Sequence, residues 1–294
     1  MSAVGLSGVS RPLKGRSLWD DALRRLMRNR AAVGGMIVLA LLTGAAILGP
    51  YLTPYGFDQV NKTDVWLGPL THGHLIGTDA LGRDLLARLF MGLRVSLAIG
   101  LVATFVSLVI GVAWGATAGF VGGRLDELMM RFVDVLYSLP FIFFVILLMV
   151  TFGSNFILIF VAIGAVEWLT MSRIVRGQTL TLKHKEFVEA ARAAGLSQGA
   201  IIARHIVPNL LGPVVVYVTL TIPAVILAES FLSFLGLGVQ PPMASLGTLI
   251  AHGAQDMELA PWLLIFPSAV MVVTLMSFNF IGDGLRDAID PKDR

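Results

Sequence analysis

The sequence predicts an all-α membrane protein that crosses the bilayer six times, and three observations carry this prediction. First, 56% of the 294 residues are hydrophobic and 14% are charged, with a mean hydropathy of +0.80. Soluble domains average about 25% charged residues, so this composition excludes an ordinary cytosolic enzyme and a disordered protein. Second, the apolar residues form long unbroken runs, which indicate spanning helices rather than the short alternating strands of a barrel. Third, Lys and Arg gather in alternate connections between these runs.

Each expected span is an apolar run bounded by charges or by turn residues. One apolar stretch is too long for a single spanning helix. We expect a turn at Gly153-Ser154-Asn155 to divide it into two spans. The fifth span is expected to begin after Pro208, a residue suited to a first helical turn. The expected spans are Ala31–Gly49, Val95–Phe120, Val135–Phe152, Phe156–Ile174, a fifth from Pro208 to Ser233, and Leu263–Gly282.

The first 30 residues are expected to form a cytoplasmic arm. Residues 1–16 are rich in Gly, Ser and basic groups, which is typical of disordered segments. From Ser17 to Arg28, apolar residues recur at helical spacing opposite three arginines, and Ser17 is a suitable cap. An amphipathic helix lying on the inner leaflet fits this pattern, and a basic flank that only sets orientation remains the alternative.

The distribution of Lys and Arg predicts that both termini are cytoplasmic. With that orientation 18 of the 22 basic residues lie inside, and four lie outside, in the periplasmic loop expected at residues 50–93 or at its border with the second span. Positive charge concentrates on the cytoplasmic side of membrane proteins, so the basic character of the chain reflects topology rather than nucleic-acid binding.

The connection between the fourth and fifth spans, residues 175–208, has a helical pattern of its own. Phe187, Ala190, Ala191 and Ala194 share one helical face, and Gly195 follows where a helix would end. Ser197 can cap a second short helix. A helix–Gly–helix unit with an alanine face suits docking into a groove of another protein, although packing against its own bundle is the alternative reading.

Several other patterns have competing explanations. Gly111, Gly115 and Gly119 lie four residues apart, which favours close helix packing over a role in lining a pore. Gly195-Leu196-Ser197-Gln198-Gly199 matches the hydrolase pattern G-x-S-x-G, with His205 nearby, but that motif requires a preceding strand. Without a P-loop or a cysteine, the chain offers no ATP-binding motif, disulfide or thiolate site of its own.

Polar residues in and beside the spans raise further possibilities. Glu167 and Glu229 are intramembrane acids, so proton coupling was weighed against simple access to water or to a partner. Four prolines fall within expected spans and would kink them, with or without a transport role: Pro140, Pro213, Pro223 and Pro267. Four outer-loop residues are compatible with a metal site but favour a capped, ion-paired turn: His74, Asp79, Arg83 and Asp84.

The 175–208 connection resembles the EAA loop of importer-type ABC transporter permeases. The resemblance rests on Glu189-Ala190-Ala191, on Gly195 after three further residues, and on Pro208. His205 stands where the general pattern has an apolar residue, and this variant is similar to the peptide/nickel branch. Further segments, in order along the chain, resemble the C-type permease of the oligopeptide group: Gly15–Trp19, Asn29–Val33, His74–Asp84, Glu229–Gly238, Asn279–Asp287 and Asp290-Pro291.

This resemblance implies a type I ABC importer permease fold, with a core of five spans over residues 94–284 and a cytoplasmic tail over 285–294. It implies a subunit that moves oligopeptides across the bacterial cytoplasmic (inner) membrane by alternating access. The partners would be a second permease, two cytoplasmic ATPases that bind ATP and Mg, and an external peptide-binding protein. No cofactor or enzymatic activity is expected in this chain. The residues that would couple it to the ATPases are Glu186, Glu189, Ala190, Ala191, Gly195, His205 and Pro208.

Two other functions remain open at this point. An ion-coupled secondary transporter would have paired intramembrane acids and inverted repeats, and neither is clear in the sequence. An intramembrane hydrolase would need a nucleophile beside a base within a span, and none is evident. The cargo also stays open between oligopeptides, dipeptides, antimicrobial peptides and nickel.

Overall fold

The computed structural model describes residues 18–152 and 156–289, and these residues are mostly helical. No strand longer than an isolated bridge occurs among them. The predicted disorder of residues 1–16, the Ser17 cap, the turn at 153–155 and the Asp290-Pro291 motif lie outside the described residues. The helices are α1 (Leu18–Arg28), α2 (Arg30–Leu52), α3 (Leu85–Val121), α4 (Gly123–Ser138), α5 (Phe141–Phe152), α6 (Phe156–Leu182), α7 (Glu186–Ala193), α8 (Gln198–Ile201), the π-helix η1 (Ile202–Ile206), α9 (Val207–Phe234), α10 (Leu246–Gln255) and α11 (Trp262–Ile289).

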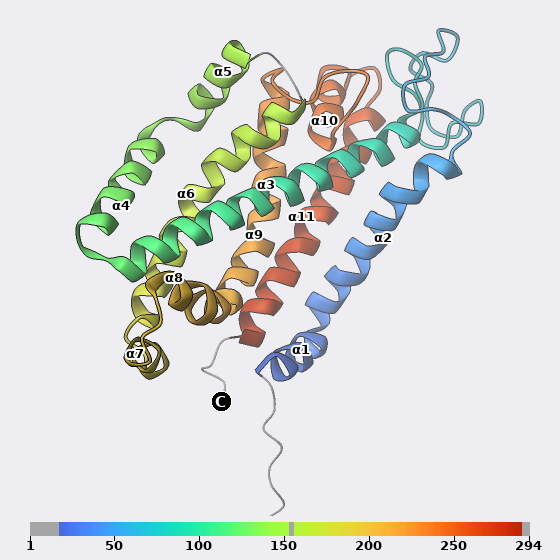
Figure 1. Ribbon diagram of the computed structural model, residues 1–294. Coiled ribbons are helices and arrows are strands. Elements are labelled where there is room, and N and C mark those ends of the chain that lie inside the picture. Colours follow the sequence, from blue (N-terminus) through green and yellow to red (C-terminus); the bar gives the residue numbers. More distant parts are fainter. Residues whose placement is uncertain (1–17, 153–155, 290–294) are drawn as a thin grey trace, which may run out of the picture.

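The long helices run side by side and place the remaining elements at two opposite ends (Figure 1). The short helices α1, α7 and α8 lie at one end, together with the last turn of α11. The outer loop, residues 53–84, and α10 lie at the other end. α3 packs most extensively against α6, and α2 packs against α11. The all-α membrane fold expected from the sequence is therefore confirmed.

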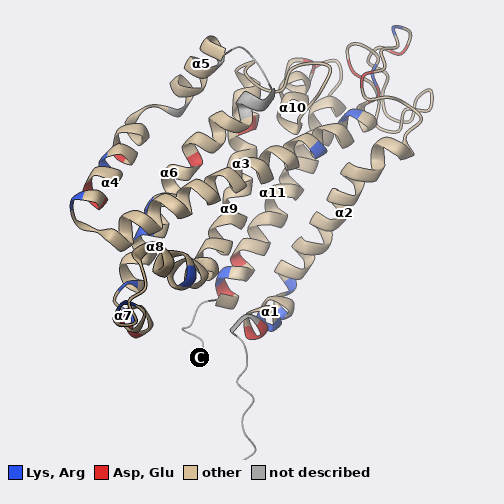
Figure 2. Ribbon diagram, in the orientation of Figure 1, with Lys and Arg blue, Asp and Glu red and all other residues tan. Residues whose placement is uncertain are grey.

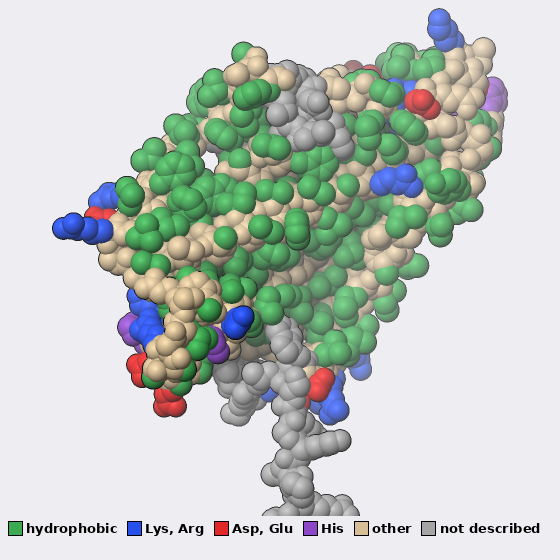
Figure 3. All heavy atoms as spheres, viewed as in Figure 1, with side chains coloured by type: hydrophobic (Ala, Val, Ile, Leu, Met, Phe, Trp, Pro, Cys, Tyr) green, Lys and Arg blue, Asp and Glu red, His purple; other side chains and the backbone are tan. Residues whose placement is uncertain are grey.

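Four of the described helices are long and apolar enough to cross a membrane, namely α2, α3, α11 and the continuous helix Gln198–Phe234. The bent pair α4–α5 counts as a fifth if it is one span. α6 has the length of a sixth, 27 residues, but it carries Glu167 near its middle and Arg173 and Arg176 in its second half. Figure 3 shows a broad hydrophobic surface over the side of the bundle, with charged side chains mainly toward its ends. This distribution matches a chain whose flanks contact lipid.

The structure breaks the third expected span, Val135–Phe152, at Pro140. α4 ends at Ser138, Leu139 is extended with ψ of 129°, and α5 leaves at 88° to α4. A proline lacks the N–H that continues a helix and disfavours helical backbone in the residue before it, which accounts for the break. By contrast, α9 and α11 continue through Pro213, Pro223 and Pro267.

Helix ends and one short helix also differ from expectation. α3 begins ten residues before Val95, because the Asp84 carboxylate caps it by accepting from Ala87 N at 2.7 Å. α11 continues past Gly282 to Ile289, since Leu285 and Ala288 pack against Leu26 of α1. α10 was not expected at all; a capping box between Ser245 and Thr248 starts it.

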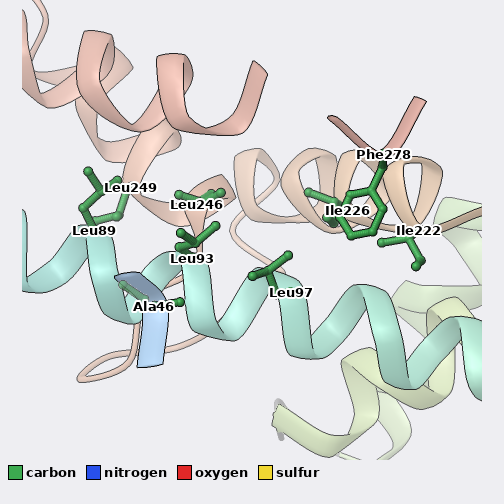
Figure 4. Close-up of a cluster of buried hydrophobic side chains, with 10 residues drawn as sticks. Ala46, Leu89, Leu93, Leu97, Ile222, Ile226, Leu246, Leu249 and Phe278 are labelled. Carbon is green, nitrogen blue, oxygen red and sulfur yellow. The ribbon is translucent and has the colours of Figure 1, made fainter. Parts of the chain in front are cut away.

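One of the buried hydrophobic clusters joins five helices, α2, α3, α9, α10 and α11 (Figure 4). Leu89, Leu93 and Leu97 recur at four-residue spacing along α3, so they form one stripe that faces the other helices. Ile226 and Leu246 of the partner helices are fully buried against that stripe. This cluster fixes α10, and with it the outer surface, to the long helices.

Candidate functional site: the helix–Gly–helix elbow

The expected helix–Gly–helix unit is formed by α7, Gly195, α8 and η1, and we call residues 186–206 the elbow. α7 ends in a Schellman motif, in which Gly195 N donates to Arg192 O at 2.9 Å and Leu196 N donates to Ala191 O at 3.2 Å. Gly195 has φ of +80°, a backbone conformation that side chains with a Cβ rarely adopt. The sharp turn between the two helices therefore requires glycine at this position.

The second half of the elbow continues directly into a spanning helix. The Ser197 hydroxyl caps α8 by accepting from Ala200 N at 3.3 Å. η1 follows, and Pro208 lies in the first turn of α9. Gln198–Phe234 is thus one continuous helical unit of 37 residues. A displacement of the elbow would be passed along this unit into the bundle.

One face of the elbow is anchored in the bundle. Val188 and Ile206 are fully buried in a hydrophobic cluster that includes Phe120 at the end of α3. The Arg192 guanidinium lies 5.1 Å from the centre of the Phe120 ring, a cation–π geometry that ties α7 to α3. This buried face attaches the elbow to the end of α3 and to the first turns of α9.

The opposite face is exposed and holds most of the expected coupling residues. Glu186, Glu189, Ala190 and Gly195 are all exposed, and nothing lies within 4 Å of a Cβ placed on Gly195. Ala191 differs: it was expected to share the face of Ala190, but it is only 6% exposed and lies on the buried side.

The remaining expected coupling residues lie beyond α7. His205 is half-buried in η1, where its backbone carbonyl accepts from Asn209 at 2.7 Å, and Pro208 is exposed. Acidic and basic residues gather around this end of the molecule (Figure 2). The exposed part of the elbow is therefore a small, low-relief surface with charged neighbours.

Three cross-helix contacts near the elbow were not expected from the sequence. The Arg176 guanidinium of α6 donates two hydrogen bonds to Asp126 of α4, at 2.6 and 2.7 Å. Arg173 pairs with Asp134 at 2.7 Å. Lys183 donates to the Gly119 carbonyl of α3 at 3.1 Å. These contacts join residues 39 to 64 positions apart, which is why no local pattern reveals them.

The three glycines of α3 face α6. A Cβ at Gly111 would lie 2.6 Å from Met171 Cβ, and one at Gly119 would lie 2.9 Å from the Arg176 carbonyl oxygen. At Gly115 it would overlap the Ser172 carbonyl oxygen. The small residues thus permit the close approach of the two helices.

The remaining candidate sites have structural partners. Ser197 joins two helices and caps α8, so it does not sit on the strand–turn–helix of a hydrolase. Glu229 is fully buried and accepts from the Ser233 and Ser245 hydroxyls at 2.7 and 2.6 Å, so the expectation that it reaches water is wrong. Glu167 lines a cavity of about 380 Å³ beside the α4–α5 break.

The outer-loop residues form the capped, ion-paired turn. His74 Nδ1 lies 2.8 Å from Asp84, which also caps α3, and Arg83 Nε lies 2.7 Å from Asp79. Within residues 18–152 and 156–289, no group of three or more His, Asp or Glu is arranged to hold a metal ion.

Two sequence families match the chain. The family described as "binding-protein-dependent transport system inner membrane component" matches residues 111–294. The family described as "N-terminal TM domain of oligopeptide transport permease C" matches residues 17–69. The second match covers α1, α2 and the first part of the outer loop.

Relatives align along nearly the whole chain. The "oligopeptide transport system permease protein OppC" of Escherichia coli is 56% identical, with 96% of this chain and 94% of that protein covered. The protein of the same name from Haemophilus influenzae is 54% identical, covering 96% and 91%. The "dipeptide transport system permease protein DppC" of Bacillus subtilis is 44% identical, covering 95% and 87%.

A solved structure shares the fold. The chain is similar to one in "inward facing conformations of the MetNI methionine ABC transporter", with a TM-score of 0.56 and 20% identity. The alignment covers 70% of this chain and 96% of the other. This likeness supports the type I importer permease fold.

Proposed function

This chain belongs to the family of binding-protein-dependent transport system inner membrane components, and from that premise we propose how its elbow drives transport. It is a permease subunit of a peptide ABC importer, and its relatives are oligopeptide and dipeptide permeases. It resides in the inner membrane as a multi-pass protein. The ion-coupled alternative has no support from these relatives.

The elbow is the proposed docking site for a cytoplasmic ATPase subunit. The observation that carries this proposal is the continuity of α8, η1 and α9 in one 37-residue helical unit with an exposed, glycine-turned end. An ATPase that grips Glu186, Glu189 and Ala190 could thereby move α9 and, through the buried cluster, α3. A loop without this helical continuity would not transmit such a displacement to α9.

The rest of the proposed assembly consists of a second permease, two ATPases that bind ATP and Mg, and an external peptide-binding protein. The elbow end, which carries α1, α7 and the end of α11, would face the cytoplasm, and the outer loop with α10 would face outward. The excess of Lys and Arg on the elbow side supports this orientation. Each partner would favour one conformation of the bundle, and ATP hydrolysis would drive alternation between them.

The experiment compares Gly195→Val with Gly199→Val in the complete assembly. Both glycines are exposed with nothing within 4 Å, but only Gly195 has positive φ, so only its substitution strains the turn. We expect Gly195→Val to reduce ATPase co-purification and peptide uptake strongly, while the permease still inserts in the membrane. Gly199→Val should behave like the wild type, and Gly195→Asn should retain most activity because Asn tolerates this conformation.

Normal ATPase co-purification and peptide uptake in Gly195→Val would overturn the docking role of the elbow. If Gly199→Val also lost ATPase co-purification and peptide uptake, the strained turn at Gly195 would not be the cause of the loss.

A further inference from the structure

A pocket with several charged side chains in its lining lies between the outer loop, the start of α3 and α10. The outer loop and α10 lie at the end opposite the elbow (Figure 1). Its volume is about 260 Å³. Its lining includes Asp79, Ala80 and Arg83 of the outer loop, Arg88 of α3 and the last turn of α10. Its charged and titratable members are Asp79, Arg83, Arg88, His252 and Asp256.

Asp79 has no remaining capacity to accept another cation. One of its oxygens accepts from the backbone N–H groups of Leu81 and Arg83, at 2.9 and 3.0 Å. The other accepts from Arg83 Nε at 2.7 Å and lies 3.4 Å from Arg88 Nε. A single carboxylate is therefore shared between two guanidinium groups.

Arg88 is left with unused hydrogen-bonding capacity although it is buried. Its side chain is 3% exposed, and it donates to the Phe57 carbonyl at 3.3 Å. Its Nε has no hydrogen-bond partner in the described part of the chain. Arg88 is ion-paired with Asp79, but a buried donor that makes no hydrogen bond is costly unless another group approaches it.

The local charge balance shows what kind of group fits. Burial, Arg88 and Arg83 lower the pKa of His252, against the opposing effects of Asp79 and Asp256, so the imidazole senses net positive charge. Two guanidinium groups face one saturated carboxylate, and Asp256 stands beside them at the end of α10. The unsatisfied group is the Arg88 Nε, which needs a hydrogen-bond acceptor, and a carboxylate matches the planar fork of a guanidinium.

The size of the pocket restricts the source of that carboxylate. Sites for whole small-molecule ligands usually measure about 300–1,000 Å³, so this pocket accommodates a side chain rather than a peptide. We propose that it is a socket for one acidic side chain of the external peptide-binding component. This inference rests on the proposed function and adds the chemistry of the contact and the residues that make it.

The test measures the affinity of the purified external binding protein for the complete importer in lipid nanodiscs. Arg83→Gln removes one guanidinium from the socket, and we expect it to weaken binding about tenfold. Asp256→Asn removes a repelling charge at the same place, and we expect it to strengthen binding about threefold. Lys62→Gln, which removes an exposed outer-loop cation that does not line the pocket, is the matched control and should not change the affinity.

Opposite effects of Arg83→Gln and Asp256→Asn support the socket, since general damage to the outer surface would weaken binding in both. Equal affinities for the wild type and both pocket variants overturn it. If instead the variants change the discrimination between free-acid and amidated peptides during uptake without changing receptor affinity, the site binds cargo and the proposal is wrong. Failure of the wild-type assembly to import peptide would contradict the proposed function itself, so the two failures are distinguishable.

Discussion

Single glycines set how closely α3 and α6 approach each other. A side chain at Gly115 would meet the Ser172 carbonyl oxygen and backbone atoms of Arg176, neither of which can rotate away. Gly177 of α6, in contrast, has nothing within 4 Å. Helix propensity favours alanine over glycine at both positions. A difference in stability between alanine at Gly115 and alanine at Gly177 therefore reports the contact between α3 and α6.

We predict that Gly115→Ala destabilises the protein by about 1–3 kcal/mol, the usual cost of forcing extra atoms into a packed core. Gly177→Ala should be neutral or slightly stabilising. Thermal unfolding in detergent measures both. A Gly115→Ala variant as stable as the wild type would mean that the two helices are not in close contact.

His252 gives the outer surface a pH dependence. Burial, Arg88 and Arg83 lower its pKa below the ordinary value near 6.5, while Asp79 and Asp256 act in the opposite direction. As the pH falls through the ordinary pKa, the unfolded state therefore binds more protons than the folded state. The free energy of unfolding thus decreases on acidification. We predict a smaller decrease in unfolding temperature between neutral and mildly acidic pH for His252→Gln. If the unfolding temperatures of the wild type and of His252→Gln depended on pH in the same way, the pH dependence could not be assigned to His252.

At the scale of elements, a bidentate ion pair helps to join α4 to α6. Asp126 is 8% exposed and holds Arg176 through two short hydrogen bonds. Asp126→Asn would leave Arg176 with a neutral partner, and because the Arg176 side chain is 35% exposed we expect a loss below the roughly 3–5 kcal/mol of a fully buried pair. We predict increased protease cleavage near the α3–α4 turn. Asp134→Asn, at an exposed pair, should have little effect, and equal cleavage in both variants would contradict this reading.

The spanning helices could be predicted because a long apolar run is sufficient to specify a span, and the elbow could be predicted because Gly195 and Ser197 mark helix ends locally. α10 could not, because its ten residues are too few for a clear period and its capping box uses Thr248 instead of the usual Glu. The face of Ala191 was assigned wrongly because Val188, not Phe187, is the residue that enters the bundle. The Arg88 pocket was missed because its members meet only in the folded chain.

At the scale of the whole molecule, the intramembrane acids do not require a proton-driven cycle. Glu229 is held by two serine hydroxyls, and Glu167 borders a cavity at the α4–α5 break. We predict that uptake by the wild type and by Glu167→Gln depends on ATP and is unaffected when the proton gradient is collapsed. Uptake by reconstituted vesicles, with and without a protonophore, measures this. Loss of uptake that follows the gradient would revive ion coupling.

The central claim is that the elbow is gripped by a motor outside this chain. The absence of cysteine in the sequence makes single-cysteine labelling direct. Ala190→Cys places a thiol on the exposed face of α7, and Lys62→Cys places one at the opposite end as a control. We predict that a maleimide labels both in the isolated permease, and that assembly with the ATPases protects Ala190→Cys alone. Equal labelling of Ala190→Cys before and after assembly would contradict the account.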